Sequence, residues 1–570
     1  MNKPANKINV YPHVIPEMEQ WPIYKLHQDR DNFIKEINNF TLDKIMAKPV
    51  DQVTDLIAKT IYLELIRIKE EPWKVDPPDE RGFWKKIRKK LLRNSLDKDP
   101  EHAQANNKEI LLKIINRYSE EIVGTFKIKT FLFARKFLKL FFHRLLNTAA
   151  ARNFHRVYSR KFSLNERLKV DGGVEAIRAL MEKGTVVVVP THFSNLDSIL
   201  IGYALDSIVG LPSFSYGAGL NLYNTGYTAY FMNRLGAYRL DRRKKNPIYL
   251  ETLKGMSSLS IQRGTNSLFF PGGTRTRSGA LETKTKLGLL GTAVEAQRVN
   301  YSKGKDEKIF IIPLILGYDM VLEAEFLIDQ HLQKTGKELY LKKDHTYSRR
   351  KVIKFLWKLF SKSSDITLSF GQPMDVLGNF VDKEGESYDK HNRKIEVRDY
   401  FISDGIIKKD LQRESEYTRM LGDKIVERFH KDNLVLSSHL IAFVIFNLLR
   451  SENNHLDIYG LLRLPSEDFI FEIEVVRQAV AAVQTELFEM EKNHEIRLSE
   501  PIHSTVDKII EEGVSRVGNY HALKPLKINK SGDIISENFK LLYYYHNRLD
   551  NYSLDKKINW KKFKLTFVEE

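Results

Sequence analysis

Residues 185–190 read TVVVVP, the clearest strand signal in the chain. A short β-branched run bounded by glycine and proline is typical of a strand buried on both faces of a parallel sheet. Three more apolar runs have the same character, SLFFP at 267–271, KIFIIPLIL at 308–316 and ITLSF at 366–370. Helical stretches such as 245–264 lie between them. Strands that alternate with helices predict an α/β domain, which we place at about residues 165–375.

The two ends of the chain have a different pattern. Residues 20–70 and 109–162 carry apolar side chains at helical spacing, with Pro72 ending the first stretch and a loop expected around 97–107. Beyond the α/β domain the pattern is again mostly helical, and a long helix is expected across 398–429. The prediction is therefore a helical N-terminal region (1–164) and a mainly helical C-terminal region (376–570).

The most apolar segment is LVLSSHLIAFVIFNLL at 434–449. As a helix it would be ~24 Å long, which is short of the ~30 Å hydrocarbon core of a bilayer. It also carries two serines, a histidine and an asparagine. We interpret it as a buried helix, with a re-entrant membrane segment as the alternative. No other segment comes as close to a membrane span.

Length and composition narrow the class of protein. The chain has 570 residues, of which 42% are hydrophobic and 29% charged, so about three or four globular units are expected and general disorder is excluded. It has no cysteine, which excludes disulfides, thiol nucleophiles and cysteine-bound metals and fits a reducing compartment. Residues 1–20 lack the apolar core of a secretory signal, so we expect the protein to stay on the cytoplasmic side.

The first candidate site is THFSNLDS, directly after the 185–190 strand. Ligand sites in α/β sheets usually lie at the carboxyl ends of strands, where His192 stands. A hydrogen bond from one ring nitrogen to Asp197 would leave the other nitrogen as a general base for a hydroxyl proton. The alternative is that His192 caps the next helix and Asp197 lies in its first turn, and spacing alone favours that alternative.

The second candidate site is FFPGGTRTRSG at 269–279. The paired Gly272 and Gly273 allow close backbone approach, and Arg275 and Arg277 could both bind a phosphate. A solvated glycine turn is an equally good interpretation of this motif alone. Neither a P-loop nor a GxGxxG dinucleotide fingerprint is present.

Two further segments indicate little by themselves. The basic run 242–245 would usually be a solvated face. Pro313, inside the apolar run 308–316, predicts an edge strand, a bulge or a strand end, because proline cannot donate to a sheet ladder.

Taken in order, these segments resemble the four motifs of the glycerophosphate acyltransferase family, in the branch of bacterial glycerol-3-phosphate and dihydroxyacetone-phosphate acyltransferases. His192, Ser194 and Asp197 match its HxSxxD box, and 218–222 with 235–242 match its second motif. FPGGTRTRSG with the later Lys286 matches the third, and IPLILGYDMVLE at 312–323 resembles the fourth. Residues 434–449 and LLYYYHNRLDNY at 541–552 resemble C-terminal segments of longer members. Many members have Glu where this chain has Gly272.

The resemblance implies a central mixed, mostly parallel sheet with flanking helices, and a direct acyl transfer. His192, oriented by Asp197, would deprotonate the sn-1 hydroxyl of glycerol 3-phosphate, which attacks an acyl-CoA or acyl carrier protein thioester. No metal or cofactor is implied. 1-Acylglycerol 3-phosphate and dihydroxyacetone phosphate are the alternative acceptors. The substrate-binding residues implied are Ser194, Arg242, Gly273, Arg275, Arg277, Lys286 and Pro313.

The charge distribution suggests where the enzyme would work. The 91 Lys and Arg against 73 Asp and Glu give a net charge of +18, which favours polyanionic partners. Runs 83–93, 131–146 and 351–360 mix basic with aromatic and leucine residues at helical spacing, so we expect peripheral binding to an anionic membrane. The alternative for each run is an apolar side packed into the core. Nucleic-acid binding is not expected because no such motif is found, and a non-catalytic basic scaffold is a distant alternative.

Overall fold

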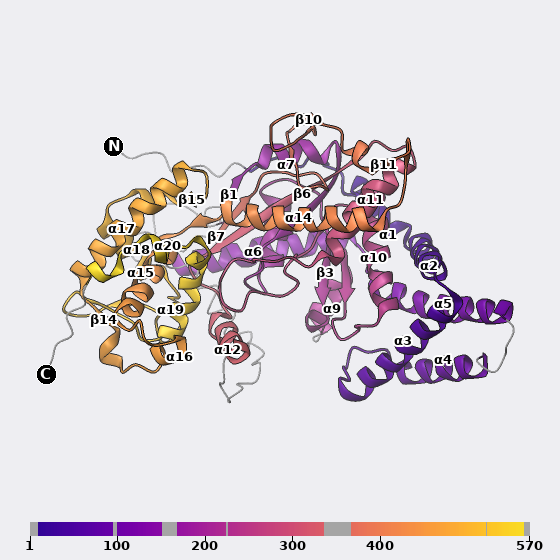
Figure 1. Ribbon diagram of the computed structural model, residues 1–570, viewed down its shortest axis with the longest axis horizontal. Coiled ribbons are helices and arrows are strands. Elements are labelled where there is room, and N and C mark those ends of the chain that lie inside the picture. Colours follow the sequence, from indigo (N-terminus) through magenta and orange to yellow (C-terminus); the bar gives the residue numbers. More distant parts are fainter. Residues whose placement is uncertain are drawn as a thin grey trace.

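The computed structural model describes residues 10–94, 100–150, 168–223, 226–335, 366–519 and 521–563. A seven-stranded sheet occupies the middle of the molecule (Figure 1). Most helices of the N-terminal region lie at one end of the sheet and most helices of the C-terminal region at the other, whereas α6 (Ile128–Ala150) and α14 (Leu411–Lys431) lie across its middle.

The sheet confirms the predicted fold class. Its strand order is β1-β7-β6-β2-β5-β3-β4, in which β6 and β7 are antiparallel and every other neighbouring pair is parallel. The four predicted strands are present, and three strands without a continuous apolar run join them. The strands are β1 (Leu168–Gly172), β2 (Gly184–Pro190), β3 (Ser215–Gly219), β4 (Ala237–Leu240), β5 (Ser267–Leu268), β6 (Lys308–Tyr318) and β7 (Ile366–Phe370).

Strand β6 lies inside the sheet, between β2 and β7, so Pro313 is not on an edge strand. Pro313 pairs with Val189 of β2, and its carbonyl accepts a hydrogen bond from Gly371, one residue past the end of β7. A strand residue directs its N and O to the same side, so the missing N–H of Pro313 falls where the β7 pairing stops. The prediction of a strand end was therefore wrong for β6 itself, because the strand that ends beside Pro313 is its neighbour β7.

Helices pack along this sheet. Helices α10 and α11 pack against each other, α11 packs against α14, and both α11 and α14 contact β6. The helices of the domain are α7 (Val174–Met181), α8 (Asp197–Ser207), α9 (Gly226–Met232), α10 (Pro247–Gln262), α11 (Leu287–Ser302) and α12 (Ala324–Thr335).

The N-terminal region is helical, and its core is shared with α10, whose Ile248 and Leu253 join the cluster formed by the N-terminal helices. Two expectations were wrong. The loop expected through residue 107 ends earlier, because Pro100 starts α5 as a first-turn proline. The helical stretch expected from residue 109 onward is interrupted at Phe126, which forms an antiparallel bridge with Leu235. The helices are α1 (Pro22–Gln28), α2 (Arg30–Met46), α3 (Val50–Glu70), α4 (Glu80–Asn94), α5 (Pro100–Ile122) and α6 (Ile128–Ala150).

The C-terminal region begins with short strands rather than helices. Within the stretch 398–429, the part before residue 408 is a 3₁₀ turn and a β-hairpin, so the expected long helix was wrong there. Asp404 and Gly405 have φ of 53° and 78°, the paired positive values that an Asp-Gly hairpin turn uses. The elements up to residue 431 are β8 (Phe380–Val381), β9 (Ser387–Tyr388), β10 (Lys394–Ile395), β11 (Ile402–Ser403), β12 (Ile406–Ile407) and α14 (Leu411–Lys431).

The apolar segment 434–449 is buried, as predicted. It forms the short strand β13 (Leu434–Val435) and helix α15 (Ser437–Glu452), of which every residue to Leu449 is buried against α17, α18 and α19. In the described parts of the chain, no helix is both long and apolar enough to span a bilayer. The remaining elements include α16 (Ile458–Leu461), β14 (Ile470–Phe471), α17 (Ile473–Lys492), β15 (Arg497–Leu498), α18 (Val506–Arg516), β16 (Lys527–Ile528), β17 (Ile534–Ile535), α19 (Phe539–His546), the 3₁₀ helix η8 (Asn547–Tyr552) and α20 (Leu554–Lys557).

Candidate active site

The loop between β2 and α8 brings His192 onto Asp197, the first residue of α8. His192 Nδ1 lies 2.8 Å from Asp197 Oδ2, and the Asp197 side chain is completely buried. The same carboxylate accepts hydrogen bonds from the N–H groups of Phe193 and Ser194, at 2.7 and 2.9 Å, and from the Tyr318 hydroxyl at 2.6 Å. His192 does not cap α8, because the N-cap residue is Leu196. The carboxylate instead fixes the histidine loop.

The His192 ring is held in one orientation. It stacks on Phe270, with 3.9 Å between the ring centroids and 20° between the planes. If Nδ1 donates to the ionised Asp197, Nε2 is the basic nitrogen of the ring. Nε2 makes no hydrogen bond with any residue that the structure describes, and the side chain keeps 14% of its surface exposed. The arrangement is that of an oriented general base.

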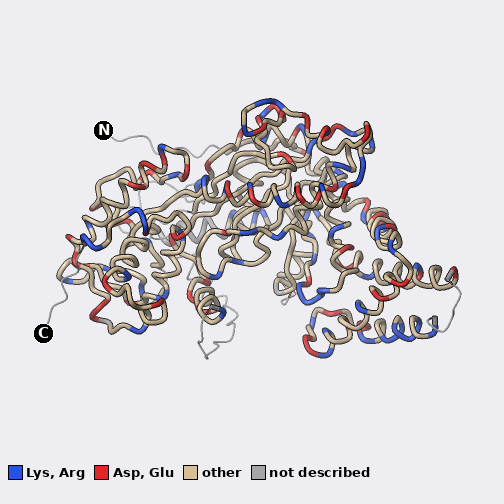
Figure 2. Tube along the Cα trace, in the orientation of Figure 1, with Lys and Arg blue, Asp and Glu red and all other residues tan. Residues whose placement is uncertain are grey.

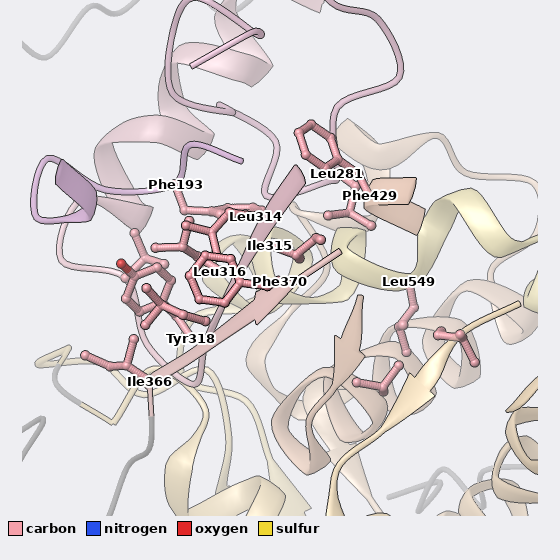
Figure 3. Close-up of a cluster of buried hydrophobic side chains, with 14 of the residues drawn as sticks. Phe193, Leu281, Leu314, Ile315, Leu316, Tyr318, Ile366, Phe370, Phe429 and Leu549 are labelled. Atoms are coloured by element: carbon pink, nitrogen blue, oxygen red, sulfur yellow. The ribbon is translucent and has the colours of Figure 1, made fainter. Parts of the chain in front are cut away.

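Strand β6 and the C-terminal region pack against the loop that carries His192. Phe193 lies in the apolar cluster to which β6 contributes Leu314 and Leu316 (Figure 3). The buried Arg548 of η8 places its guanidinium 4.4 Å from the Phe193 ring centroid and donates to the Leu316 carbonyl at 2.6 Å. Burial lowers the pKa of Arg548 to about 10. Sequence reasoning did not single out Arg548, although it lies in the quoted segment 541–552.

Glu323, a second buried carboxylate, links the fourth motif to the first and the third. Glu323 accepts hydrogen bonds from the Ser194 hydroxyl at 2.8 Å and from the Asn195 N–H at 3.1 Å, and it forms an ion pair with Arg275 at 3.3 Å. The Ser194 hydroxyl is therefore bonded within the protein, and its contact with substrate stays a prediction. Glu323 ends the quoted segment 312–323, yet its role depends on a contact 129 residues away in the sequence.

Positive charge gathers near the histidine loop. Desolvation and the nearby positive charge of Arg275 lower the pKa of Arg242. The Lys286 side chain lies against Gly273, where a Cβ would come within 2.9 Å of Nζ and where φ is +74°. Among the residues described, neither Arg242 nor Lys286 has a carboxylate partner. The Thr276 N–H donates to the His192 carbonyl at 2.8 Å, which fixes this turn beside the histidine.

Two of the predicted substrate-binding residues contact other parts of the protein. Arg277 reaches α12, where its Nε donates to Gln330 at 3.1 Å. Pro313 is buried within β6, so its effect on a substrate would act through the sheet. For both residues a role in substrate binding stays a prediction.

Part of the chain is similar to known acyltransferases. Residues 170–317 match the family model described as Acyltransferase. On this similarity, residues 170–317 are called the acyltransferase domain. It contains His192, Asp197 and the predicted cations, whereas Glu323 and Arg548 lie outside the matched range.

Relatives of this chain include proteins named glycerol-3-phosphate acyltransferase. The protein of Pseudomonas fluorescens is 23% identical over 278 residues, which are 49% of this chain and 30% of the relative. The protein of Aeromonas hydrophila is 28% identical over 223 residues, covering 38% and 25%. That of Pseudomonas syringae pv. tomato is 25% identical over 275 residues, covering 48% and 30%. Each match spans less than a third of the relative's length, and together they confirm the family resemblance.

A third carboxyl group lies inside the acyltransferase domain, beside the histidine. Glu282 Oε1 accepts the His192 N–H at 3.1 Å. Burial is the main reason that its pKa rises to about 7, and the charge of Asp197 adds to the effect, while the His192 N–H and the positive charge of Arg548 oppose it. No group of three or more His, Cys, Asp or Glu among the described residues could hold a metal ion.

The raised pKa of Glu282 predicts a pH-dependent stability. A carboxyl that binds its proton more tightly in the folded state contributes stability that is complete below the unfolded pKa of about 4.5 and is lost as pH rises to about 7. The loss should approach about 3 kcal/mol, because each pKa unit corresponds to 1.36 kcal/mol. Glu282→Gln removes this loss, so its free energy of unfolding relative to wild type should rise between pH 4.5 and 7 and then level off. Denaturant titrations across that range measure it, and a pH-independent difference would contradict it.

Proposed function

We propose that the protein transfers a fatty acyl group from acyl-CoA or acyl carrier protein to the sn-1 hydroxyl of glycerol 3-phosphate, a step of phospholipid synthesis. The observation that carries the proposal is the His192–Asp197 pair, in which four hydrogen bonds hold the carboxylate and Nε2 is left for a substrate hydroxyl. The names of the relatives and the matched acyltransferase model support the reaction class.

The proposed reaction needs no covalent enzyme intermediate. His192 Nε2 takes the proton of the acceptor hydroxyl as its oxygen attacks the thioester carbonyl. The C–O bond forms, the C–S bond breaks, and the thiolate leaves with the proton that the imidazolium returns. Asp197 stabilises the imidazolium between these two steps, because its carboxyl group is already in contact with Nδ1.

The acceptor's phosphate is proposed to bind the cations beside the loop. Arg242 and Lys286 have no carboxylate partner among the described residues, whereas Arg275 shares its charge with Glu323. Guanidinium groups bind phosphate through charge-assisted hydrogen bonds, which places the acceptor as well as holding it. Each proposed acceptor carries a phosphate, so this recognition does not separate them.

The base is tested by His192→Ala. We expect acyl transfer to glycerol 3-phosphate to fall about 10²- to 10⁴-fold with folding intact, because the general base is lost. Thiol release from a labelled acyl donor is measured for wild type with each of the three acceptors in parallel. His391→Ala, which removes an exposed histidine of the C-terminal region, is the matched control. Near-normal activity of His192→Ala would refute the mechanism.

The phosphate site is tested by Arg242→Ala. Loss of one charge-assisted hydrogen bond should raise KM for glycerol 3-phosphate about ten- to a hundredfold, which corresponds to about 1.4–2.7 kcal/mol. Glycerol has no phosphate, so any acyl transfer to glycerol should be unaffected. Arg393→Ala, at an exposed guanidinium, is the control. An equal loss with both acceptors would show that Arg242 does not bind the phosphate.

The membrane part of the proposal rests on α6. Its described side chains include Phe133 and Phe137, which are 59% and 53% exposed, and the exposed Lys136 and Lys139 lie among them. Helix α4 differs: Lys and Arg follow one another along it (Figure 2), but its Trp84 is buried in the N-terminal core. The third predicted run, 351–360, lies outside the described residues. We therefore propose α6 as the segment that inserts into an anionic bilayer.

The double variant Phe133→Asp/Phe137→Asp tests the membrane surface. Because each inserted phenylalanine contributes about 1.5–3 kcal/mol, binding to vesicles that contain phosphatidylglycerol should weaken at least about tenfold. Tyr62→Asp changes an aromatic residue that is 64% exposed on α3, and it should bind as wild type does. Vesicle co-sedimentation at low and high salt measures the effect. Unchanged binding by the α6 variant would contradict the assignment.

A further inference from the structure

Gly272 and Glu282 occupy one space beside the histidine. A Cβ built on Gly272 would lie 3.1 Å from Glu282 Cγ and 3.3 Å from Glu282 Oε1, and its three nearest neighbours all belong to that side chain. Gly273 has a positive φ, but Gly272 does not, so the backbone at 272 can carry a side chain without strain. The Glu282 side chain therefore occupies the space that a side chain at residue 272 would take.

Glu282 uses only half of its carboxyl group within the protein. Oε1 accepts the N–H of His192 at 3.1 Å. The next N–H along the main chain, that of Phe193, donates to Asp197. Oε2 is buried and has no hydrogen-bond partner among the described residues. An unpaired buried oxygen destabilises a fold. Its presence here indicates that the carboxyl serves the loop rather than the stability of the domain.

We propose that Glu282 is a positioning residue for His192 and that it supplies, from a second chain position, the carboxyl group that Gly272 lacks. By holding the His192 N–H it fixes the main chain while Asp197 and Phe270 fix the ring. The effect on catalysis rests on the proposed acyl transfer, but the shared space of residues 272 and 282 does not.

The first test separates positioning from substrate binding. Glu282→Ala should lower kcat about ten- to a hundredfold and change KM for glycerol 3-phosphate less than about threefold, because the base is displaced while the phosphate site remains. Glu282→Gln keeps the acceptor for the His192 N–H and should retain at least about a third of kcat. Glu325→Ala, at an exposed glutamate of α12, is the control. A raised KM with normal kcat, or a normal kcat in Glu282→Ala, would overturn the positioning role.

The second test moves the carboxyl group. Gly272→Glu/Glu282→Ala puts a carboxyl side chain into the space that Glu282 vacates, and its kcat should exceed that of Glu282→Ala at least about tenfold. Gly272→Glu alone crowds two carboxyl groups together and should be less active than wild type. If the double variant folds and is no more active than Glu282→Ala, the exchange of positions is wrong.

The third test does not depend on activity. Gly272→Ala should lower the melting temperature by about 2 °C in the wild-type background, where its methyl group meets Glu282, and by much less in the Glu282→Ala background. Equal shifts in both backgrounds would overturn the shared space. Wild-type protein that is inactive with all acceptors, but shows unequal shifts, would overturn the proposed function and leave this contact standing.

Discussion

The Asp197 carboxylate is the group on which the site depends. A buried charge is stable only when donors surround it, and Asp197 has an imidazole, two main-chain N–H groups and a tyrosine hydroxyl. The tyrosine is Tyr318, the last residue of β6, whereas the other donors belong to the loop after β2. The contact between these two strand ends is held by the Thr191 N–H, which donates to Leu314, and by Leu316, whose N–H donates to the Thr191 hydroxyl. The hydrogen bonds that continue the pairing of β2 with β6 therefore also hold together the two segments that contact Asp197.

Both negative and positive side chains surround the histidine loop. The carboxylates of Glu323 and Glu282 accept protein N–H and O–H groups, so their hydrogen bonds stabilise the loop itself. Arg242 and Lys286 lack a carboxylate partner in the described chain, and desolvation together with the like charge of Arg275 lowers the pKa of Arg242. Cations crowded together in this way are relieved by a bound anion.

The sequence predicts those parts of the fold that depend on a local pattern of residues. Strands β2 and β6 are buried on both faces and show unbroken apolar runs, while β3 reads SYGAG and gave no signal. The helix start at Pro100 and the Asp404-Gly405 hairpin both carried local signals, but the first lay in an expected loop and the second in an expected helix. The site is less predictable, because its partners are distant: Tyr318 lies 121 residues from Asp197, and only the fold brings them together. The order of the motifs predicted His192 and Asp197, but nothing local marked Glu282, Glu323 or Arg548.

The acyltransferase domain and the C-terminal region form a single structural unit at the end of β6. Arg548 donates to the Leu316 carbonyl, His439 Nε2 lies 3.2 Å from the Tyr318 carbonyl, and the Ser438 hydroxyl donates to Asp319 at 2.7 Å. Every one of these contacts is buried and polar, so removing the C-terminal partner would leave an unpaired group directly behind Asp197. The matched range ends at residue 317, one residue before the tyrosine that holds the carboxylate. The matched range therefore contains His192, Asp197 and Phe270, while the tyrosine and the arginine that support them lie beyond it.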